Sequence, residues 1–313
     1  MPALPRPAAD HPLAKLTTFL WHYVRDDDAE PRVGAGRVRP DAFDAQLDRI
    51  GRRFTVVDWP TVASALDGGA PLPVAAALLT FDDGLVDHHA TVLPRLEARG
   101  WPAVFFVMAR RPGDRLSVGH RIHILLADRS PTQLRDEVVA RLGPADRQRF
   151  EDAETRERAA GVDAIDVVKR PLQRDLADTV GPILSALIEE RHGTESDVAD
   201  ELHLSPQQLV DLRAAGMTIG GHGLRHLWLD HEPMGRVRDE IDASAALVAG
   251  DRAPAPFAYP YGAGRAEAPD LLAKAGFTAA FHASPTVSEG RWDLGRVDAE
   301  DRTFDAAIEE AGR

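Results

Sequence analysis

Two adjacent carboxylates follow an apolar segment in the first half of the chain. Residues 75–81 have the character of a buried strand and lead directly into Asp82, Asp83 and Gly84. Neighbouring side chains on an extended strand point to opposite faces, but a bend at Gly84 would turn both carboxylates toward one pocket. Two carboxylates in one pocket repel each other unless a cation holds one of them. The pattern therefore indicates either a metal site or a simple Asp-Asp-Gly turn.

Two histidines four positions apart, His222 and His226, follow a second strand-like segment at 217–220. Positions i and i+4 lie on the same side of a helical turn, so the two imidazoles can share a metal ion. Together with Asp83 they supply two imidazoles and one carboxylate, a set that suits Zn²⁺ and also Co²⁺, Ni²⁺ or Fe²⁺. Three protein ligands leave positions open for water and substrate, as a catalytic site requires. The alternative is an ordinary pair of surface or core histidines.

A third segment, Tyr-Pro-Tyr-Gly at 259–262, follows another strand-like segment. A proline between two aromatic residues would shape one wall of a pocket, and the backbone N–H after the turn would face a developing oxyanion. The same composition also occurs in rigid turns, so this segment supports the other two without standing alone.

The elements that must position these residues alternate along most of the chain. Strand-like segments are predicted at 16–21, 54–58, 75–81, 103–108, 217–220, 256–259 and 277–281. Helical spacing is found at 41–49, 85–99 with a kink at Pro94, 206–215, 233–249 and 267–275. This alternation predicts an α/β fold with a parallel sheet and outer helices. Seven or eight such units suit a closed or nearly closed barrel, and a doubly wound open sheet is the alternative.

The alternation stops between residues 110 and 204. This stretch is charged and helix-forming, with helices predicted at 133–142, 147–160 and 167–191. We therefore expect a barrel built from residues 1–109 and 205–313, with a largely helical insertion at 110–204. The insertion is either a lid or substrate-selecting subdomain, or a structural or dimerising appendage.

The composition excludes several classes of protein. The 313 residues carry 50 acidic and 37 basic side chains, a net charge of −13, which argues against a general nucleic-acid binder. The absence of cysteine excludes disulfides, thiolate metal sites and a cysteine nucleophile. No apolar run is long enough to span a bilayer, and the proline-rich first residues lack the apolar core of a signal peptide. We expect a soluble, cytoplasmic protein, and a homo-oligomer remains open.

The three motifs together resemble those of the polysaccharide deacetylase family (NodB-homology, carbohydrate esterase family 4). They are Thr-Phe-Asp-Asp-Gly at 80–84, His222-x-x-x-His226 and Tyr-Pro-Tyr-Gly at 259–262, and their order also fits. The resemblance covers residues 15–108 and 205–300. It implies a distorted (β/α)7-type barrel, a divalent metal and hydrolytic deacylation, usually of acetylated sugars.

The resemblance also implies roles for individual residues. Asp83, His222 and His226 would hold the metal, Zn²⁺ in the first instance. Asp82 would be the general base, and Tyr261 would offer its backbone N–H to the oxyanion.

The sequence departs from the usual family pattern in three places. Gly223 stands where Ser or Thr commonly follows the first histidine, Tyr259 stands where many members carry an arginine, and no Leu-x-His motif occurs near the C-terminus. That last motif normally supplies the catalytic acid. His22, which follows the first strand, resembles the acid of permuted members such as the poly-N-acetylglucosamine deacetylases, and His282 is the competing candidate.

Arg296 is a candidate to replace the missing arginine by pairing with Asp82, with an ordinary surface ion pair as the alternative. Four other histidines are predicted to lie on helix surfaces or in the insertion and not to bind metal: His88, His89, His120 and His123.

These assignments predict a metal-dependent hydrolase that removes an acetyl or formyl group from an N-acylated amino sugar or glycan. Two alternatives share the same site. One is amidohydrolysis of a small amide that is not a sugar, and the other is an inactive carbohydrate-binding homologue.

Overall fold

The computed structural model describes residues 11–251, 254–285, 290–300 and 302–310. Its main sheet is parallel throughout, with the strand order β10-β1-β5-β6-β7-β8-β9, and β4 pairs with the beginning of β5. The bounds of these strands are β1 Leu16–Trp21, β4 Thr55–Val56, β5 Ala76–Phe81, β6 Val104–Val107, β7 Thr218–Gly221, β8 Phe257–Ala258, β9 Ala280–Phe281 and β10 Val297–Asp298. This curled sheet confirms the predicted distorted (β/α)7-type barrel.

The two ends of the sheet approach each other through the segment before β10. Phe281 of β9 forms a parallel bridge to Leu294, and β10, three residues later, pairs with Phe19 and Leu20 of β1. Segments near the start and end of the chain therefore lie beside each other. As a result, residues that follow β1 and residues near β10 reach the same edge of the sheet.

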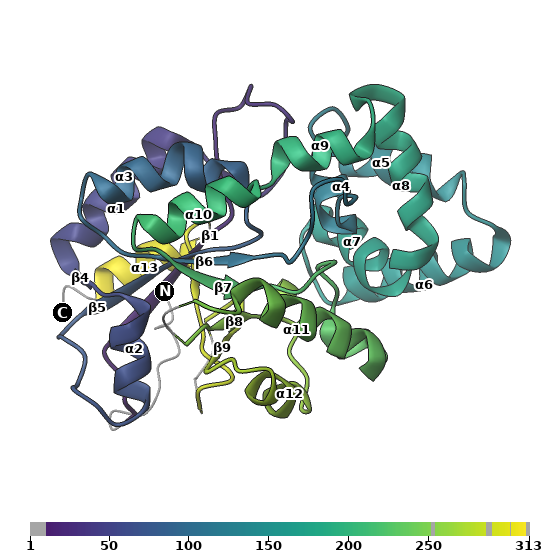
Figure 1. The fold of residues 1–313 in the computed structure, drawn as a ribbon. Coiled ribbons are helices and arrows are strands. Elements are labelled where there is room, and N and C mark those ends of the chain that lie inside the picture. The colour runs from purple at the N-terminus through teal and green to yellow at the C-terminus, as the bar shows by residue number, and fades with distance from the viewer. Residues whose placement is uncertain (1–10, 252–253, 286–289, 301, 311–313) are drawn as a thin grey trace.

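Helices cover the outside of the sheet (Figure 1). They are α1 Pro40–Arg53, α2 Trp59–Leu66, α3 Leu93–Glu97, α10 Pro206–Ala214, α11 Met234–Val248, α12 Ala268–Lys274 and α13 Arg302–Glu310. In α1 the residues Phe43, Leu47 and Ile50 form one buried stripe, as the helical spacing predicted. Residues 86–97 form one helical run, as predicted, and its hydrogen-bond pattern changes from the π-helical turn His88–Val92 to α3 directly before Pro94.

The insertion forms a helical cluster at one end of the molecule, drawn in blue to green on the right of Figure 1. Its helices are α4 Val118–Leu125, α5 Pro131–Val139, α6 Pro144–Ala159, α7 Ala164–Arg170, α8 Ala177–His192 and α9 Glu195–Leu202. The cluster has an apolar core of its own, which also includes Tyr23, Val33 and Leu85 from the barrel. Whether 110–204 is a separate domain stays a prediction.

The predicted helix at 167–191 is wrong in one respect. It is two helices, α7 and α8, separated by a π-helical turn, Pro171–Asp175. Pro171 has no N–H to donate to the helix before it, and Leu176 leaves the helical region with φ −129° and ψ 15°. A periodic apolar pattern persists through such a break because both helices contribute residues to the same apolar core.

Three short strands were not predicted: β10, and the pair β2 Tyr23–Val24 and β3 Arg37–Val38. Two-residue strands carry no alternation that a sequence pattern can detect. The prediction that the first residues lack a signal peptide falls largely on residues 1–10, outside the described residues. Among the described residues, no helix combines the length and apolar character needed to cross a membrane.

Candidate metal centre

The motif residues meet at the carboxyl edge of the sheet. His22 follows β1, Asp82 and Asp83 follow β5, and His222 follows β7. The Asp82 N–H donates to the carbonyl of Trp21 at 2.9 Å, which ties the ends of β1 and β5 together. Because all strands of the sheet run parallel, their carboxyl ends share one edge, where ligands usually bind in α/β folds.

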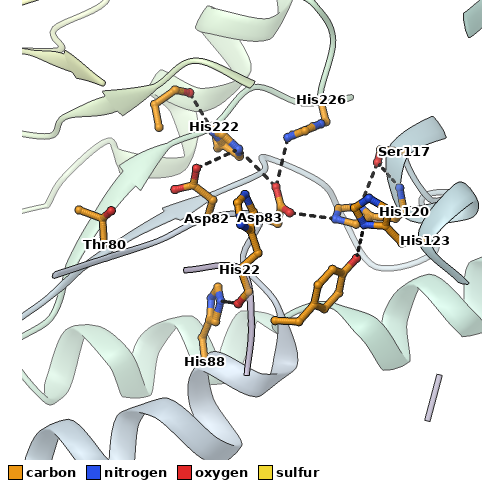
Figure 2. Close-up of polar contacts among 12 residues, drawn as sticks. His22, Thr80, Asp82, Asp83, His88, Ser117, His120, His123, His222 and His226 are labelled. Carbon is orange, nitrogen blue, oxygen red and sulfur yellow. Dashed lines mark hydrogen bonds and ion pairs between the residues drawn. The ribbon is translucent and has the colours of Figure 1, made fainter. Parts of the chain in front are cut away.

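Asp83 lies at the centre of the cluster (Figure 2). Its Oδ1 is 3.3 Å from His222 Nε2 and 3.2 Å from His226 Nε2. One ligand atom from each of the three residues lies within 4.8 Å of the other two. The structure therefore brings together the three side chains that the sequence predicted as metal ligands.

The donor atoms of this cluster fit a cation. His222 Nδ1 is 2.8 Å from the carbonyl of Ala258, so the ring proton lies there and Nε2 presents a bare lone pair. That lone pair faces Asp83 Oδ1, a buried oxygen without a hydrogen-bond partner. Two unprotonated acceptors at this distance repel unless a positive charge lies between them, and a divalent metal supplies one.

Charge also keeps Asp83 ionised. Burial acts to raise the pKa of this carboxyl, but the neighbouring His226 and His120 hold its pKa well below the ordinary value. An ionised carboxylate is the form that binds a metal.

The segment from His222 to His226 is a loop and not the helical turn that the spacing suggested. Gly223 and His226 both adopt left-handed backbone conformations, with φ +75° and +58°. The buried Glu240 stabilises this loop by accepting the N–H groups of Leu224 and Arg225 at 2.8 and 2.9 Å. The loop still brings the centroids of the two imidazole rings to 4.9 Å from each other.

The same loop explains the glycine at 223. A Cβ on this residue would lie 2.8 Å from Glu240 Oε2, and an L-residue with side chain strongly disfavours φ +75°. Here the Glu240 carboxylate occupies the space that a side chain at 223 would need.

Asp82 is held by Arg296, as the sequence suggested. The guanidinium donates from Nη1 to Asp82 Oδ1 and from Nη2 to Oδ2, both at 2.6 Å, and both side chains are buried. Burial acts to raise the pKa of Asp82, but Arg296 and His222 lower it below the ordinary value. Asp82 Oδ2 is also 3.8 Å from His222 Nε2, so Asp82 lies beside the predicted ligands without being one of the three.

His22 lies at the same carboxyl edge of the sheet as Asp82 and Asp83. Its Nδ1 is 3.6 Å from Glu300 Oε1. Burial acts to lower the pKa of this imidazole, but Glu300, Asp83 and Asp82 raise its pKa to about 10. His282, the competing acid, has Nδ1 2.8 Å from the carbonyl of Gly262. Its ring packs against Tyr259, in the third motif.

Tyr261 completes the edge. Its ring centroid is 4.3 Å from that of His226, and it stacks on Trp228 at 4.7 Å. Among the described residues, four that are not glycine have positive φ: Ala75, Asp83, His226 and Tyr261. Three of these belong to the three motifs, and such strained backbone is typical of functional sites.

Some of the residues at this edge were missed or misplaced by the sequence analysis. His88 is buried and does not lie on a helix surface as predicted, whereas His120 lies in the insertion, as predicted, and is buried there. His88 Nε2 is 3.1 Å from the His22 carbonyl, and His120 contacts Asp83. Glu300 gave no signal because it follows the undetected strand β10.

A family model, curated proteins and solved structures match this chain. The model of the family described as polysaccharide deacetylase matches residues 70–141 and 182–280, which together exceed half of the chain. The chain belongs to the polysaccharide deacetylase family. Two curated relatives, both poly-beta-1,6-N-acetyl-D-glucosamine N-deacetylases, from Escherichia coli K12 and O157:H7, are each 37% identical to this chain over 86 residues. That match covers 27% of this chain and only 12% of each relative.

Solved deacetylase structures have the same fold as this family member. IcaB from Ammonifex degensii has a TM-score of 0.59 at 18% identity, covering 96% of this chain and 97% of its own. Streptococcus pyogenes deacetylase PplD, solved with acetate, has a TM-score of 0.58 at 14% identity, covering 94% and 97%. A de-N-acetylase from Aggregatibacter actinomycetemcomitans has a TM-score of 0.55 at 15% identity, covering 95% and 99%. At these identities the likeness concerns the fold.

Proposed function

We propose that this polysaccharide deacetylase homologue is a metal-dependent hydrolase that removes the acetyl group from an N-acetylated amino sugar. The observation that carries the proposal is that the adjacent carboxylates of Asp82 and Asp83 have different surroundings. Asp83 faces two imidazoles, whereas Asp82 is clamped by Arg296 beside them. One carboxylate is thereby available to hold a cation and the other to move a proton.

Asp83, His222 and His226 would hold the cation, which is Zn²⁺ in the first instance. When bound, a divalent cation supplies a Lewis acid that acidifies water and polarises a carbonyl oxygen. The remaining steps belong to residues of this chain.

Asp82 takes the proton from the water that adds to the acyl carbon. Each carboxylate oxygen accepts more than one hydrogen bond, so the two bonds from Arg296 fix Asp82 and still leave lone pairs for that proton. The backbone N–H of Tyr261 donates to the oxyanion that develops on the acyl oxygen.

His22 gives a proton to the nitrogen as the C–N bond breaks, because an amine leaves poorly unless it is protonated. The contact with Glu300 supports this role, since it raises the pKa of His22 and so favours the protonated ring. The products are acetate and the free amino sugar, and no further reactant is needed.

The substrate class follows the relatives. The curated relatives are named for poly-beta-1,6-N-acetyl-D-glucosamine, which favours an N-acetylglucosamine residue of a glycan over a small amide. The formyl group remains a second acyl candidate. Location in the cytoplasm stays a prediction, which fractionation of host cells tests.

The test is acetate release by the Zn²⁺-loaded protein. The substrates are β-1,6- and β-1,4-linked N-acetylglucosamine oligomers, their N-formyl forms and a simple N-acetyl amide. The proposal predicts acetate from a sugar oligomer, and a loss of about 10²–10⁴-fold in kcat for Asp82→Asn, the range of general base catalysis. Asp211→Asn, which alters an exposed carboxylate 3.1 Å from His89, is the matched control and keeps wild-type kcat.

Two outcomes would contradict the proposal. Turnover of the simple amide without turnover of any sugar would make the protein a non-sugar amidohydrolase. Stoichiometric metal with no turnover of any substrate would make it an inactive homologue.

A further inference from the structure

A histidine of the helical insertion contacts the candidate metal centre. His120, in α4, is buried, and its Nε2 lies 3.2 Å from Asp83 Oδ2 (Figure 2). The other carboxylate oxygen, Oδ1, is the one that faces His222 and His226. The two oxygens of Asp83 are thus divided between the predicted metal ligands on one side and the insertion on the other.

The neighbouring Ser117 offers a hydroxyl proton to one nitrogen of His120. Ser117 is the N-cap of α4, and its Oγ accepts the backbone N–H of His120 at 3.1 Å. The same Oγ lies 3.0 Å from His120 Nδ1, so its hydroxyl proton is available to donate to that nitrogen. The ring proton of a neutral His120 then lies on Nε2 and is donated to Asp83 Oδ2.

Further contacts fix α4 against the same edge of the barrel. Gly119 makes room for Tyr261, because a Cβ at 119 would lie 2.9 Å from the Tyr261 hydroxyl. The chain leaving the insertion returns to the Asp-Asp-Gly turn, where the N–H of Leu204 donates to the carbonyl of Gly84 at 2.9 Å. The ring of His203 packs edge-on against His120 at 4.8 Å. Both the first helix of the insertion and its exit thus contact the turn that carries Asp83.

We propose that His120 is a positioning residue for the metal centre. Its hydrogen bond to Oδ2 orients the Asp83 carboxylate so that Oδ1 alone faces the cation, and the insertion thereby becomes part of the site. The inference rests on the metal-dependent function proposed above. Residues that hydrogen-bond to metal ligands in this way commonly change metal affinity about 10–100-fold when they are removed.

The test is the Zn²⁺ dissociation constant of the full chain, measured by calorimetric titration of the metal-free protein. We expect His120→Ala to raise it by about 10–100-fold. His120→Gln offers an amide N–H and is expected to recover part of the affinity. Ser117→Ala keeps the imidazole but loses the hydroxyl, and is expected to have an effect smaller than that of His120→Ala.

The matched control is His123→Gln. His123 lies on the same helix one turn away and pairs with the Tyr23 hydroxyl at 3.3 Å. It is expected to keep the wild-type dissociation constant. Circular dichroism of each metal-free variant verifies that it is folded.

Several results would overturn the inference. One is a wild-type dissociation constant in folded His120→Ala, and another is an equal loss in His123→Gln, which would indicate a general loosening of α4. Fewer imidazole ligands in the X-ray absorption spectrum of zinc-loaded His120→Ala would make His120 a ligand and not a positioning residue. If the wild type itself binds no divalent metal, the proposed function fails together with this inference.

Discussion

Replacing Arg296 tests how the buried carboxylate Asp82 is maintained. The guanidinium donates four hydrogen bonds: two to Asp82, one to the carbonyl of His282 at 2.6 Å and one to Thr80 Oγ1 at 3.3 Å. Arg296 is fully buried and Asp82 is 2% exposed, so water cannot replace these bonds. Breaking a buried pair by removing one partner commonly costs about 3–5 kcal/mol, because the other charge remains buried and unpaired.

We therefore expect Arg296→Met to lower the free energy of unfolding by about 3–5 kcal/mol at pH 7, measured by urea denaturation. Arg296→Lys keeps the charge but not the two-pronged contact, and is expected to fall between Met and wild type. Adding Asp82→Asn to Arg296→Met removes the stranded charge and is expected to recover part of the loss.

The matched control is Arg213→Met. Arg213 also contacts both oxygens of a carboxylate, that of Asp251, at 2.7 and 3.2 Å, but this pair is partly exposed. Its loss is expected to cost about 1 kcal/mol or less. Equal losses for Arg296→Met and Arg213→Met would refute the reasoning, since the buried pair is expected to cost several times as much as the partly exposed one.

Three further predictions concern the loop, the acid and the insertion. Gly223 has φ +75°, so we expect Gly223→Ala to cost roughly 1–2 kcal/mol of stability from the backbone alone. The new Cβ would also lie 2.8 Å from a buried carboxylate oxygen of Glu240, so we expect weaker Zn²⁺ binding as well. Gly250→Ala, at φ +89° with no atom near its Cβ, is the control that carries only the backbone effect and keeps Zn²⁺ affinity. His22→Ala is expected to slow amide hydrolysis by about 10²–10⁴-fold and hydrolysis of an activated ester far less, and equal losses for both substrates would argue against an acid role. Burial acts to raise the pKa of Glu154, but Arg135 lowers it below the ordinary value of 4.5. The ionised carboxylate therefore stabilises the folded state above pH 4.5. This contribution is lost as the pH falls through the pKa of Glu154 in the folded state. The stability deficit of Glu154→Gln in urea denaturation, about 1 kcal/mol at pH 7, is therefore expected to vanish on acidification, and a deficit that persists at low pH would contradict this.

Much of the site was predictable because its residues directly follow predicted strands. Asp82, Asp83, His222 and Tyr261 all follow apolar segments that form strands of one parallel sheet, so they meet at its carboxyl edge. The pairing of Arg296 with Asp82 was also suggested by the sequence. The pairing forms because β10, which directly follows Arg296, lies beside β1, and β1 lies beside β5.

Other features depended on tertiary structure that no local pattern encodes. His120 reaches Asp83 only because the insertion folds back on the sheet edge, and its separation in sequence gives no periodic signal. The His222–His226 pair meets through a loop held by Glu240, although the spacing suggested a helix. Glu300 follows a strand of two residues, too short to show alternation.

The central claim is that Asp83, His222 and His226 hold a single divalent ion. X-ray absorption spectroscopy at the zinc edge of the zinc-loaded protein, combined with elemental analysis, tests it most directly. We expect one ion per chain, with two imidazole nitrogens and carboxylate oxygen among its ligands, and loss of that ion in Asp83→Ala. An ion without histidine ligands, or no bound ion in the wild type, would contradict it.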